Sequence, residues 1–368
     1  MKLLFFAPRL HTNQYEILKG LKKKHKISFH SIYKGKTEDH SIIRPKIINQ
    51  STISIFLKKI LGIKDNKLIF FPNINEYFFL LKREKPDYII IRIYGKVYPY
   101  IIAIISKILK IKIIFYDQYD ISLRHLKKKT LINFLKKIEI FFRCFLFESV
   151  IFSPIKSKKV FNKIFYLPFV SNVKVNKKLK TNKRTKILIV SKFQKRKNLL
   201  FAFEVLEILL KSYNFSVTYA GEVSNLQHKK IYHKLKNKIK NSKYSNNFNI
   251  FKNVSFKKMP DLYKKNDIFL LPANNEPASI SILEAMSHGL VTICSDSCAT
   301  KTYLPNLNKN VFKSNNKKDL MKSLKFYLDS NTNILKFKTI NYKYCINNFT
   351  FDKYYQKLES ILEYYEKK

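Results

Sequence analysis

The chain has 368 residues, 46% of them hydrophobic, and this length and composition predict two folded domains and exclude a disordered protein. Its 72 Lys and Arg residues outnumber 25 Asp and Glu residues, and the formal charge of +47 favours contact with phosphates, anionic lipid or nucleic acid. Residue types with AT-rich codons are abundant throughout, so coding bias on solvated faces is an alternative source of the charge.

Short apolar runs alternate with helical patterns along the chain, which is typical of parallel sheets covered by helices. In the first half, strands are predicted at residues 2–6, 26–30, 88–91 and 112–115, and a helix at 13–24. The polar, lysine-rich segment 172–184 is typical of a linker. The pattern then restarts, with strands predicted at residues 186–190, 215–220, 268–271 and 291–294 and a helix at 198–211.

Two segments, 97–115 and 131–147, mix aliphatic and aromatic residues with lysines. Each predicts either a core helix followed by a buried strand or a helix lying flat in a membrane interface, and core packing is the commoner outcome. Neither is an uninterrupted apolar stretch long enough to span a bilayer. The apolar run before Pro8 is too short for a secretory signal, so we expect a cytoplasmic protein, peripheral on the inner face of the cytoplasmic membrane.

The four cysteines form no CxxC pair, and Cys294 and Cys298, the only close pair, have no histidine at ligand spacing. We therefore expect reduced thiols and no metal site. The chain contains no GxG motif, which excludes the glycine turn of a dinucleotide-binding dehydrogenase. It also contains no DxD, so a divalent cation bridging a diphosphate is not signalled.

Two glutamates, Glu276 and Glu284, stand eight residues apart after the predicted strand 268–271. Pro277 suits a first helical position, so a helix is predicted over residues 277–288. The backbone amides left unpaired at its N-terminus, which bind phosphate well, are those of Ala278, Ser279 and Ile280. This arrangement predicts that one carboxylate contacts a sugar's hydroxyls and the other contacts a ribose, while a phosphate binds between them.

A basic loop, SKFQKRKN, follows the predicted strand 186–190 and places Lys192 at the strand's end and Lys197 five residues later. In a parallel sheet this loop lies on the same edge as the loop that carries Glu276. Two cations could then meet a phosphate held by helix-end amides. The alternative is an ordinary lysine cluster in a lysine-rich chain.

Together these residues resemble the retaining GT-B glycosyltransferases of glycosyltransferase family 4 (glycosyl transferases group 1). The resemblance rests on Glu276-x7-Glu284, the following Ala285-Met286 and Gly289, and a strand ending in Ser295-Asp296, and it covers residues 186–328. It implies a GT-B fold, with two Rossmann-like, doubly wound parallel-sheet domains facing across a cleft. The expected division is an acceptor-binding domain at 1–172, a linker at 173–184, a nucleotide-sugar-binding domain at 185–348 and a C-terminal helix at 349–368 that packs back on the first domain.

The resemblance also implies roles for the matched residues. Glu276 contacts the donor sugar and Glu284 the ribose, while Lys197 and Lys192 hold the diphosphate, with Lys192 standing where the family usually has an arginine. Lysine lacks the bidentate fork of arginine, so altered diphosphate geometry is expected. The remaining expected donor-binding positions are Ser279, Ile280, Gly221, Cys298, Ala299 and Thr300.

The first domain departs most from the family pattern. It lacks the glycine-rich loop after its first strand, and Tyr116, Asp117 and Gln118 stand where a histidine near the reacting sugar is often found. His11 and Asp117 are therefore candidates on the acceptor side.

The implied activity is transfer of a sugar from a nucleotide-diphosphate sugar to a glycan or lipid-linked acceptor, with retention and without a metal or other cofactor, in cell-surface polysaccharide or lipopolysaccharide synthesis. An anionic membrane surface is a further expected partner, and no specific nucleic acid is expected. The alternatives are a nucleotide-sugar epimerase of the same fold and a non-catalytic basic protein that binds lipid or nucleic acid.

Overall fold

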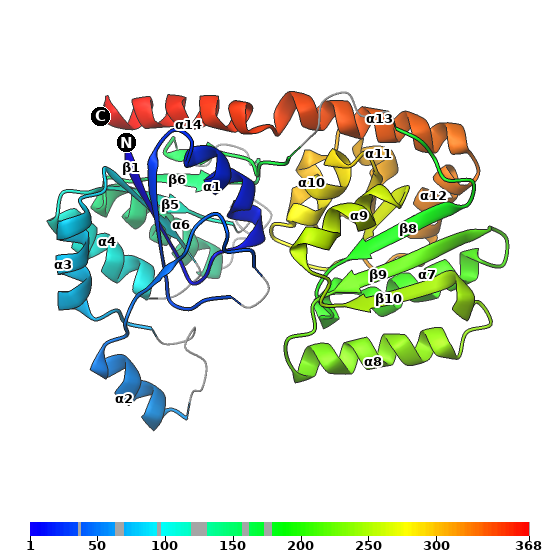
Figure 1. Cartoon of the computed structure of the whole chain (residues 1–368), viewed down its shortest axis with the longest axis horizontal. Coiled ribbons are helices and arrows are strands. Elements are labelled where there is room, and N and C mark those ends of the chain that lie inside the picture. Colours follow the sequence, from blue (N-terminus) through cyan, green and yellow to red (C-terminus); the bar gives the residue numbers. More distant parts are fainter. Residues whose placement is uncertain are drawn as a thin grey trace. The chain divides into compact units, whose positions relative to one another are not determined.

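The computed structural model describes residues 1–35, 38–62, 70–93, 97–118, 131–156, 162–172 and 179–367. Within them the chain forms two compact units: Met1–Phe169 together with Tyr354–Lys368, and Val170–Lys353. Each unit is a parallel sheet flanked by helices (Figure 1), so the predicted class of two Rossmann-like, doubly wound domains is confirmed.

The first unit contains a sheet of seven described strands, all parallel. In spatial order they are β3 (Lys46–Ile47), β2 (Lys26–Ser31), β1 (Lys2–Ala7), β4 (Tyr88–Arg92), β5 (Lys112–Tyr116), β6 (Val150–Ser153) and β7 (Ile164–Tyr166). The four strands predicted from the sequence each extend one residue further than expected. All five residues of β4 are buried, as expected for a central parallel strand covered on both faces.

The described helices of the first unit are α1 (Tyr15–Leu21), α2 (Thr52–Ile60), α3 (Ile74–Glu84), α4 (Tyr98–Ile108), α6 (Leu131–Leu146) and α14 (Phe351–Glu366). The predicted first helix begins as a 3-10 turn, Thr12–Gln14, before α1. Helices α3, α4 and α6 contribute to one core with β1, β4 and β5. Segments 97–115 and 131–147 therefore do form core helices, each leading to a strand, and among the described residues no helix is long and apolar enough to cross a membrane.

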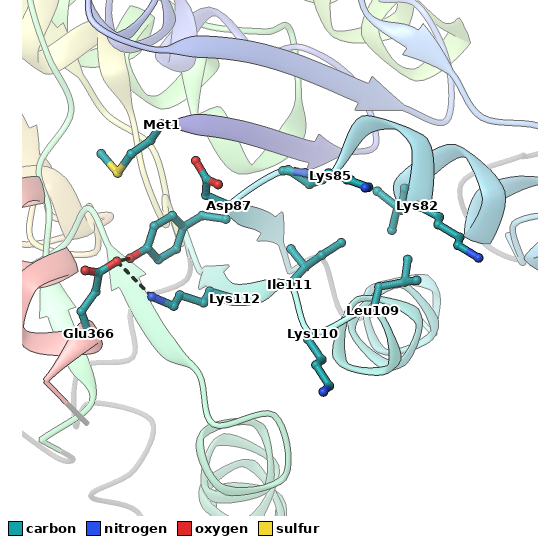
Figure 2. Close-up of a pocket in the computed structure, with 12 residues that line it drawn as sticks. Met1, Lys82, Lys85, Asp87, Leu109, Lys110, Ile111, Lys112 and Glu366 are labelled. Carbon is teal, nitrogen blue, oxygen red and sulfur yellow. Dashed lines mark hydrogen bonds and ion pairs between the residues drawn. The ribbon is translucent and has the colours of Figure 1, made fainter.

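Helix α14, near the C-terminus, packs on the first unit although the second unit, Val170–Lys353, intervenes in the chain. The Glu366 carboxylate accepts from the Tyr88 hydroxyl at 2.5 Å and from Lys112 Nζ at 3.0 Å (Figure 2). Tyr88, Lys112 and Glu366 line a pocket of about 540 Å³ together with Met1 and Asp87. The pocket lies at the amino ends of the strands, whereas ligand sites of doubly wound sheets lie at the carboxyl ends.

The second unit contains a sheet of six described strands, again all parallel. In spatial order they are β10 (Phe248–Lys252), β9 (Phe215–Gly221), β8 (Thr185–Val190), β11 (Ile268–Leu271), β12 (Val291–Ser295) and β13 (Val311–Phe312). Its helices are α7 (Leu199–Leu209), α8 (Leu226–Lys240), α9 (Met259–Lys264), α10 (Ile280–Ser287), α11 (Leu307–Asn310), α12 (Lys317–Leu328) and α13 (Asn331–Asn348).

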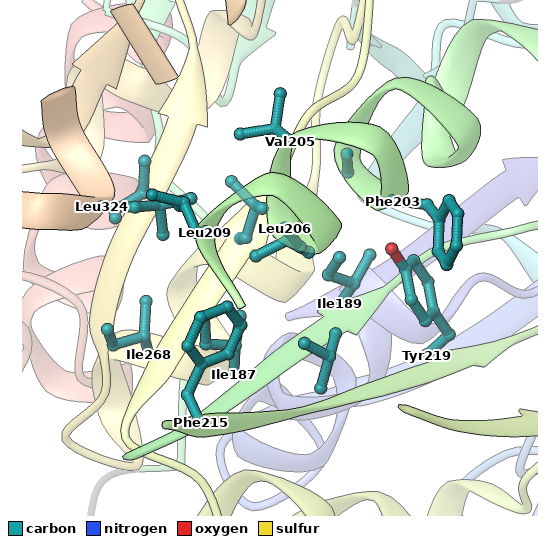
Figure 3. Packing of buried hydrophobic residues seen from close by; sticks show 14 of the residues in the cluster. Ile187, Ile189, Phe203, Val205, Leu206, Leu209, Phe215, Tyr219, Ile268 and Leu324 are labelled. Carbon is teal, nitrogen blue, oxygen red and sulfur yellow. The ribbon is translucent and has the colours of Figure 1, made fainter. Parts of the chain in front are cut away.

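The core of the second unit lies between β8, β9 and β11 and the inner faces of α7 and α12 (Figure 3). Ile187 and Ile189 point from β8 toward Leu206 and Leu209 of α7. Complete burial of one such side chain stabilises the fold by about 1.5–3 kcal/mol. This packing fixes the strand ends from which the polar loops emerge.

Candidate functional site

The two central strands of the second sheet end side by side, because β8 and β11 pair in parallel with Ile187 opposite Ile268. The strand order reverses between them, and ligand sites of doubly wound folds lie at such a switch point. The loops that follow the two strands are also bonded to each other, since the Asn274 N–H donates to the Arg196 carbonyl at 2.7 Å. The structure thus brings the basic loop and the loop of Glu276 together.

Two asparagines give these loops their shape. Asn198 (φ 56°) and Asn275 (φ 51°) both adopt the left-handed conformation, which asparagine tolerates better than most residues. Asn198 ends the 3-10 turn Lys195–Lys197 and begins α7, and Asn275 directly precedes Glu276. These turns direct the side chains of Lys197 and Glu276 toward each other.

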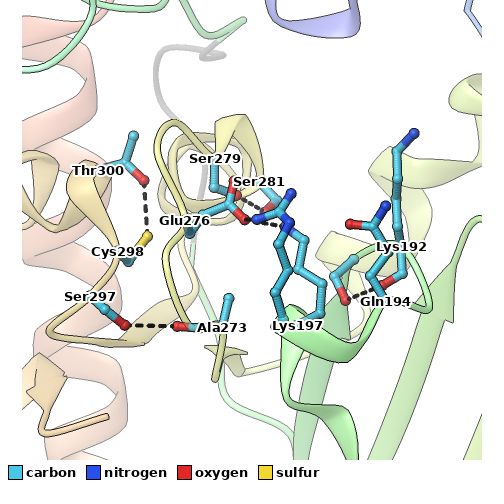
Figure 4. A network of polar contacts seen from close by, with 12 residues as sticks. Lys192, Gln194, Lys197, Ala273, Glu276, Ser279, Ser281, Ser297, Cys298 and Thr300 are labelled. Atoms are coloured by element: carbon cyan, nitrogen blue, oxygen red, sulfur yellow. Dashed lines mark hydrogen bonds and ion pairs between the residues drawn. The ribbon is translucent and has the colours of Figure 1, made fainter. Parts of the chain in front are cut away.

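Glu276 is the centre of the site (Figure 4). Its side chain is only 6% exposed, and its Oε2 accepts from Arg196 Nη1 at 2.6 Å and also from Lys197 Nζ. The Lys197 side chain is 8% exposed, whereas that of Arg196 is 43% exposed. One carboxylate shared by two cations leaves a net positive charge at the carboxyl edge of the sheet.

Burial and charge act in opposite directions on Glu276. Burial disfavours its ionised form, but the charges of Lys197 and Arg196 and the bonds that they donate outweigh this, so the pKa of Glu276 is lowered. Burial lowers the pKa of Lys197, and the attraction of Glu276 opposes that effect. Glu276 is therefore a carboxylate near neutral pH, held ionised by the pair of cations.

Lys192, which the resemblance places with Lys197 on the diphosphate, contacts a different carboxylate in this structure. Its Nζ is 2.7 Å from Glu222 Oε2, in the loop after β9, and Figure 4 shows its ammonium turned away from Glu276. Arg196, to which the sequence interpretation gave no role, contacts the glutamate instead. The signal for Arg196 was its place in the Lys195–Lys197 run, since a guanidinium presents a fork of donors suited to phosphate.

Gly221 ends β9 and touches the basic loop. A Cβ built on it would lie 2.0 Å from the Ser191 carbonyl oxygen and 2.9 Å from Phe193 Cε2. Any side chain at this position would displace the backbone of the loop after β8. Gly221 therefore permits the close approach that positions this loop, a role distinct from direct contact with a donor.

The helix that follows Glu276 begins later than predicted. Helix α10 starts at Ile280 and ends at Ser287, so the expectation that Pro277 is a first helical position is wrong. Ser279 is the residue before the helix, and its Oγ lies 2.7 Å from Ser281 Oγ. Ile280 remains among the amides of the first turn, which lack partners within an α-helix.

Glu284 is half-buried on α10 and accepts a hydrogen bond from the Tyr263 hydroxyl at 2.7 Å. Burial and the neighbouring carboxylate raise the pKa of Tyr263, so this hydroxyl stays protonated and remains a donor. The Tyr263 ring also stacks on His288, with centroids 5.2 Å apart. Tyr263, which the sequence did not single out, thus fixes the orientation of Glu284.

The loop after β12 closes over Glu276 through its backbone. Cys298 pairs with Glu276 in an isolated parallel bridge, and the Ala299 N–H donates to the Glu276 carbonyl at 2.8 Å. The Cys298 and Thr300 side chains are fully buried and 3.3 Å apart, so these two residues can offer a ligand only their main chain. The four cysteines are free thiols, and within the described ranges no group of three His, Cys, Asp or Glu side chains is arranged to hold a metal ion.

The two acceptor-side candidates lie in the first unit. The His11 N–H bonds Gln14 Oε1 at 3.4 Å, so this residue caps the 3-10 turn before α1. Asp117 follows β5, is 6% exposed, and lies 3.7 Å from Nη1 of the buried Arg143 on α6. Asp117, which the resemblance led us to consider as a residue on the acceptor side, is therefore paired with a buried arginine.

Residues 171–344 match the family model described as Glycosyl transferases group 1. No curated protein matches the chain by sequence. A solved glycosyltransferase from Rickettsia africae ESF-5 is similar over 100% of this chain and 98% of its own, with a TM-score of 0.74 and 17% identity. Anabaena Alr3699/HepE, solved in complex with UDP-glucose, is similar over 99% of both chains, with a TM-score of 0.74 and 11% identity. WaaG, a glycosyltransferase involved in lipopolysaccharide biosynthesis, is similar over 98% of both chains, with a TM-score of 0.63 and 13% identity.

These likenesses confirm the GT-B fold expected from the sequence, with two Rossmann-like domains on one chain. The group 1 match covers most of the second unit and includes all of the residues that surround Glu276.

Proposed function

We propose that the protein is a retaining, metal-independent glycosyltransferase that moves a sugar from a nucleotide-diphosphate sugar to a glycan or lipid-linked acceptor. The observation that carries this proposal is the Glu276 carboxylate shared by Lys197 and Arg196 at the switch point of a sheet. Both the group 1 match and the GT-B fold support transfer of a sugar as the chemistry of such a site.

The site couples donor binding to the release of Glu276. Before donor binds, the carboxylate neutralises part of the charge of Lys197 and Arg196. The diphosphate of the donor competes for these cations, and the phosphate oxygens match the fork of a guanidinium. Glu276 is then free to accept hydrogen bonds from the sugar's hydroxyls, while Glu284, oriented by Tyr263, is placed for the ribose.

During transfer the bond from the anomeric carbon to the diphosphate oxygen breaks, and the acceptor oxygen bonds to that carbon with the same configuration. Negative charge grows on the departing diphosphate, whose leaving oxygen takes up the proton of the acceptor hydroxyl. Lys197 and Arg196 stabilise this charge, because cations in a water-poor site interact with it more strongly than in bulk water. Lys192 reaches the diphosphate only after leaving Glu222, so Arg196 ranks ahead of it.

The acceptor side belongs to the first unit, with His11 and Asp117 as candidates, and the acceptor is a glycan or a lipid-linked intermediate of surface polysaccharide or lipopolysaccharide synthesis. The UDP-glucose complex of Alr3699/HepE and the pathway of WaaG support UDP-sugars as first donors to test and this class of acceptor. The site of action that follows is the cytoplasmic face of the membrane on which such acceptors are made.

The proposal is tested by measuring which nucleotide sugars raise the melting temperature of the purified protein. The donor that binds is then incubated with candidate acceptors, and NMR reports the anomeric configuration of the product. Release of nucleoside diphosphate that depends on acceptor, with retention, is expected. Conversion of the donor without any acceptor would instead identify an epimerase, and the absence of binding to every nucleotide sugar would refute the proposal.

A further inference from the structure

Helix α6 (Leu131–Leu146) is apolar on two opposite sides. One side packs on the core of the first unit, where Ile140 and Cys144 are buried together with Phe147, which lies just beyond the end of the helix. The opposite stripe points into solvent, with side chains 50–71% exposed, and consists of Phe134, Leu135, Phe141, Phe142, Phe145 and Leu146. These positions recur at the helical period, so they form one continuous face.

Helix α4 lies beside α6 and extends this face. The Tyr100 hydroxyl of α4 bonds the Glu139 carboxylate of α6, and Lys107 Nζ bonds the carbonyl of Leu146. Ile104 and Ile108 of α4 are 50% and 65% exposed. We call these two isoleucines together with the six exposed residues of α6 the α4–α6 face.

The α4–α6 face is too apolar to be an ordinary solvated surface. Phe141 and Phe145 stack on each other while exposed, with centroids 5.8 Å apart and rings inclined by 6°. Monomeric proteins rarely expose contiguous apolar patches of more than a few hundred Å², and larger ones mark interaction sites. Phenyl rings bury about 150–250 Å² each when covered, so a partner would gain substantial hydrophobic stabilisation here.

Exposed lysines on both helices point to the nature of the partner. Lys107 on α4, Lys110 just after it and Lys137 on α6 are exposed. Glu139 and Glu148 are the nearby acids, and they are engaged by Arg143 and Lys107 respectively at 3.6 Å. A second copy of a chain with a formal charge of +47 would be repelled electrostatically, whereas an anionic surface would be attracted.

We propose that the α4–α6 face docks on a bilayer that contains anionic lipid. The phenyl rings enter the boundary between headgroups and acyl chains, and the lysines meet lipid phosphates. Docking goes beyond the proposed sugar transfer, because it needs neither nucleotide sugar nor acceptor. It would hold the first unit at the surface where a lipid-linked acceptor resides.

The test is co-sedimentation with vesicles of phosphatidylcholine, with and without phosphatidylglycerol, at low and high salt and without nucleotide sugar. The variant Phe141→Ser/Phe145→Ser is compared with Leu226→Ser/Phe251→Ser, whose target residues in the second unit are 74% and 45% exposed. Wild type and this control are expected to bind the anionic vesicles, weaker at high salt, and the α6 variant at least about tenfold more weakly. The α6 variant should keep its melting temperature, because the removed rings are exposed.

Equal binding of the α6 variant and wild type would overturn the proposal. Loss of binding in Ile53→Ser/Phe56→Ser alone would also overturn it, since these residues of α2 are 64% and 62% exposed and offer a rival contact. A wild-type dimer in light scattering that becomes a monomer in the α6 variant would assign the face to self-association. Sugar transfer to a soluble acceptor by the α6 variant separates failure of docking from failure of the proposed enzyme activity.

Discussion

Replacement of Glu276 by Gln isolates the charge at the centre of the site. Glutamine keeps the size and one carbonyl acceptor, but it leaves Lys197, whose side chain is 8% exposed, without a counter-ion. Arg196 is 43% exposed and can turn to water, so its contribution is screened. The cost therefore comes mainly from one buried ammonium.

Breaking a buried ion pair by removing one partner costs about 3–5 kcal/mol. Two factors reduce the cost of Glu276→Gln: glutamine keeps a carbonyl acceptor, and Lys197 can release its proton. We therefore expect the free energy of unfolding to fall by about 3 kcal/mol, near the lower limit of this range. For a unit of this size each kcal/mol shifts the melting temperature by about 2–4 °C, so we expect a decrease of about 6–12 °C. Hydrogen bonds that sugar hydroxyls donate to a charged group contribute about 1.5–3 kcal/mol, so kcat/KM should fall by about 10- to 150-fold.

Asp267→Asn is the matched control, at the opposite end of β11. Asp267 is fully buried and accepts from Lys338 Nζ at 3.0 Å, from Lys186 N at 3.1 Å and from Asn182 N at 3.2 Å. In differential scanning calorimetry, Asp267→Asn should destabilise the second unit about as much as Glu276→Gln does. In an assay of nucleoside diphosphate release at a temperature where both variants are folded, only Glu276→Gln should lose activity. If the two variants retained equal kcat/KM, Glu276 would be a structural ion-pair residue and the proposed site would be refuted.

The remaining predictions concern the cations, the strand end and pH. In isothermal titration calorimetry, Arg196→Met should raise the Kd of the nucleoside diphosphate about tenfold or more, whereas Lys192→Met should raise it less than about threefold. A larger effect of Lys192→Met would favour the assignment of Lys192 to the diphosphate that the sequence suggested. Gly221→Ala should lower the free energy of unfolding by about 1–3 kcal/mol and weaken binding of the nucleoside diphosphate, because the new Cβ meets the Ser191 carbonyl. Unchanged binding would show that Gly221 does not position the site. The lowered pKa of Glu276 stabilises the fold above the ordinary carboxyl value of about 4.3, and this stabilisation is lost as pH falls through the folded pKa. The difference in unfolding free energy between wild type and Glu276→Gln should thus be constant from about pH 7 to pH 5 and shrink below about pH 4, and a difference that persists in acid would contradict the ion-pair account.

The sequence predicted the central strands well because they are buried on both faces and appear as continuous apolar runs, as in β4 and β11. It did not predict edge strands such as β7 and β10, whose residues are largely half-buried or exposed, so their apolar signal is weak. These strands form because a neighbouring strand offers hydrogen bonds, which is information from elsewhere in the chain.

The start of α10 shows how distant contacts override a local signal. Pro277 predicted a helix beginning directly after Glu276. The bridge between Glu276 and Cys298, and the bond from Ala299 N to the Glu276 carbonyl, instead keep this segment extended until Ile280. The preference of proline for a first helical position depends only on its neighbours in sequence. The loop that overrides this preference lies more than twenty residues later in the sequence, so the local pattern does not reveal it.

The sequence by itself determined that Glu276 and the basic loop share one sheet edge, because parallel strands place the loops after them at the same edge whatever their side chains do. Only the tertiary structure decided which cation meets the carboxylate. A left-handed turn at Asn198 and the direct bond between the two loops bring Arg196 and Lys197 onto Glu276, while Glu222, in the loop after β9, holds Lys192 away. Side-chain direction depends on backbone turns and on partners distant in sequence, and a pattern of residue types along one chain does not contain either.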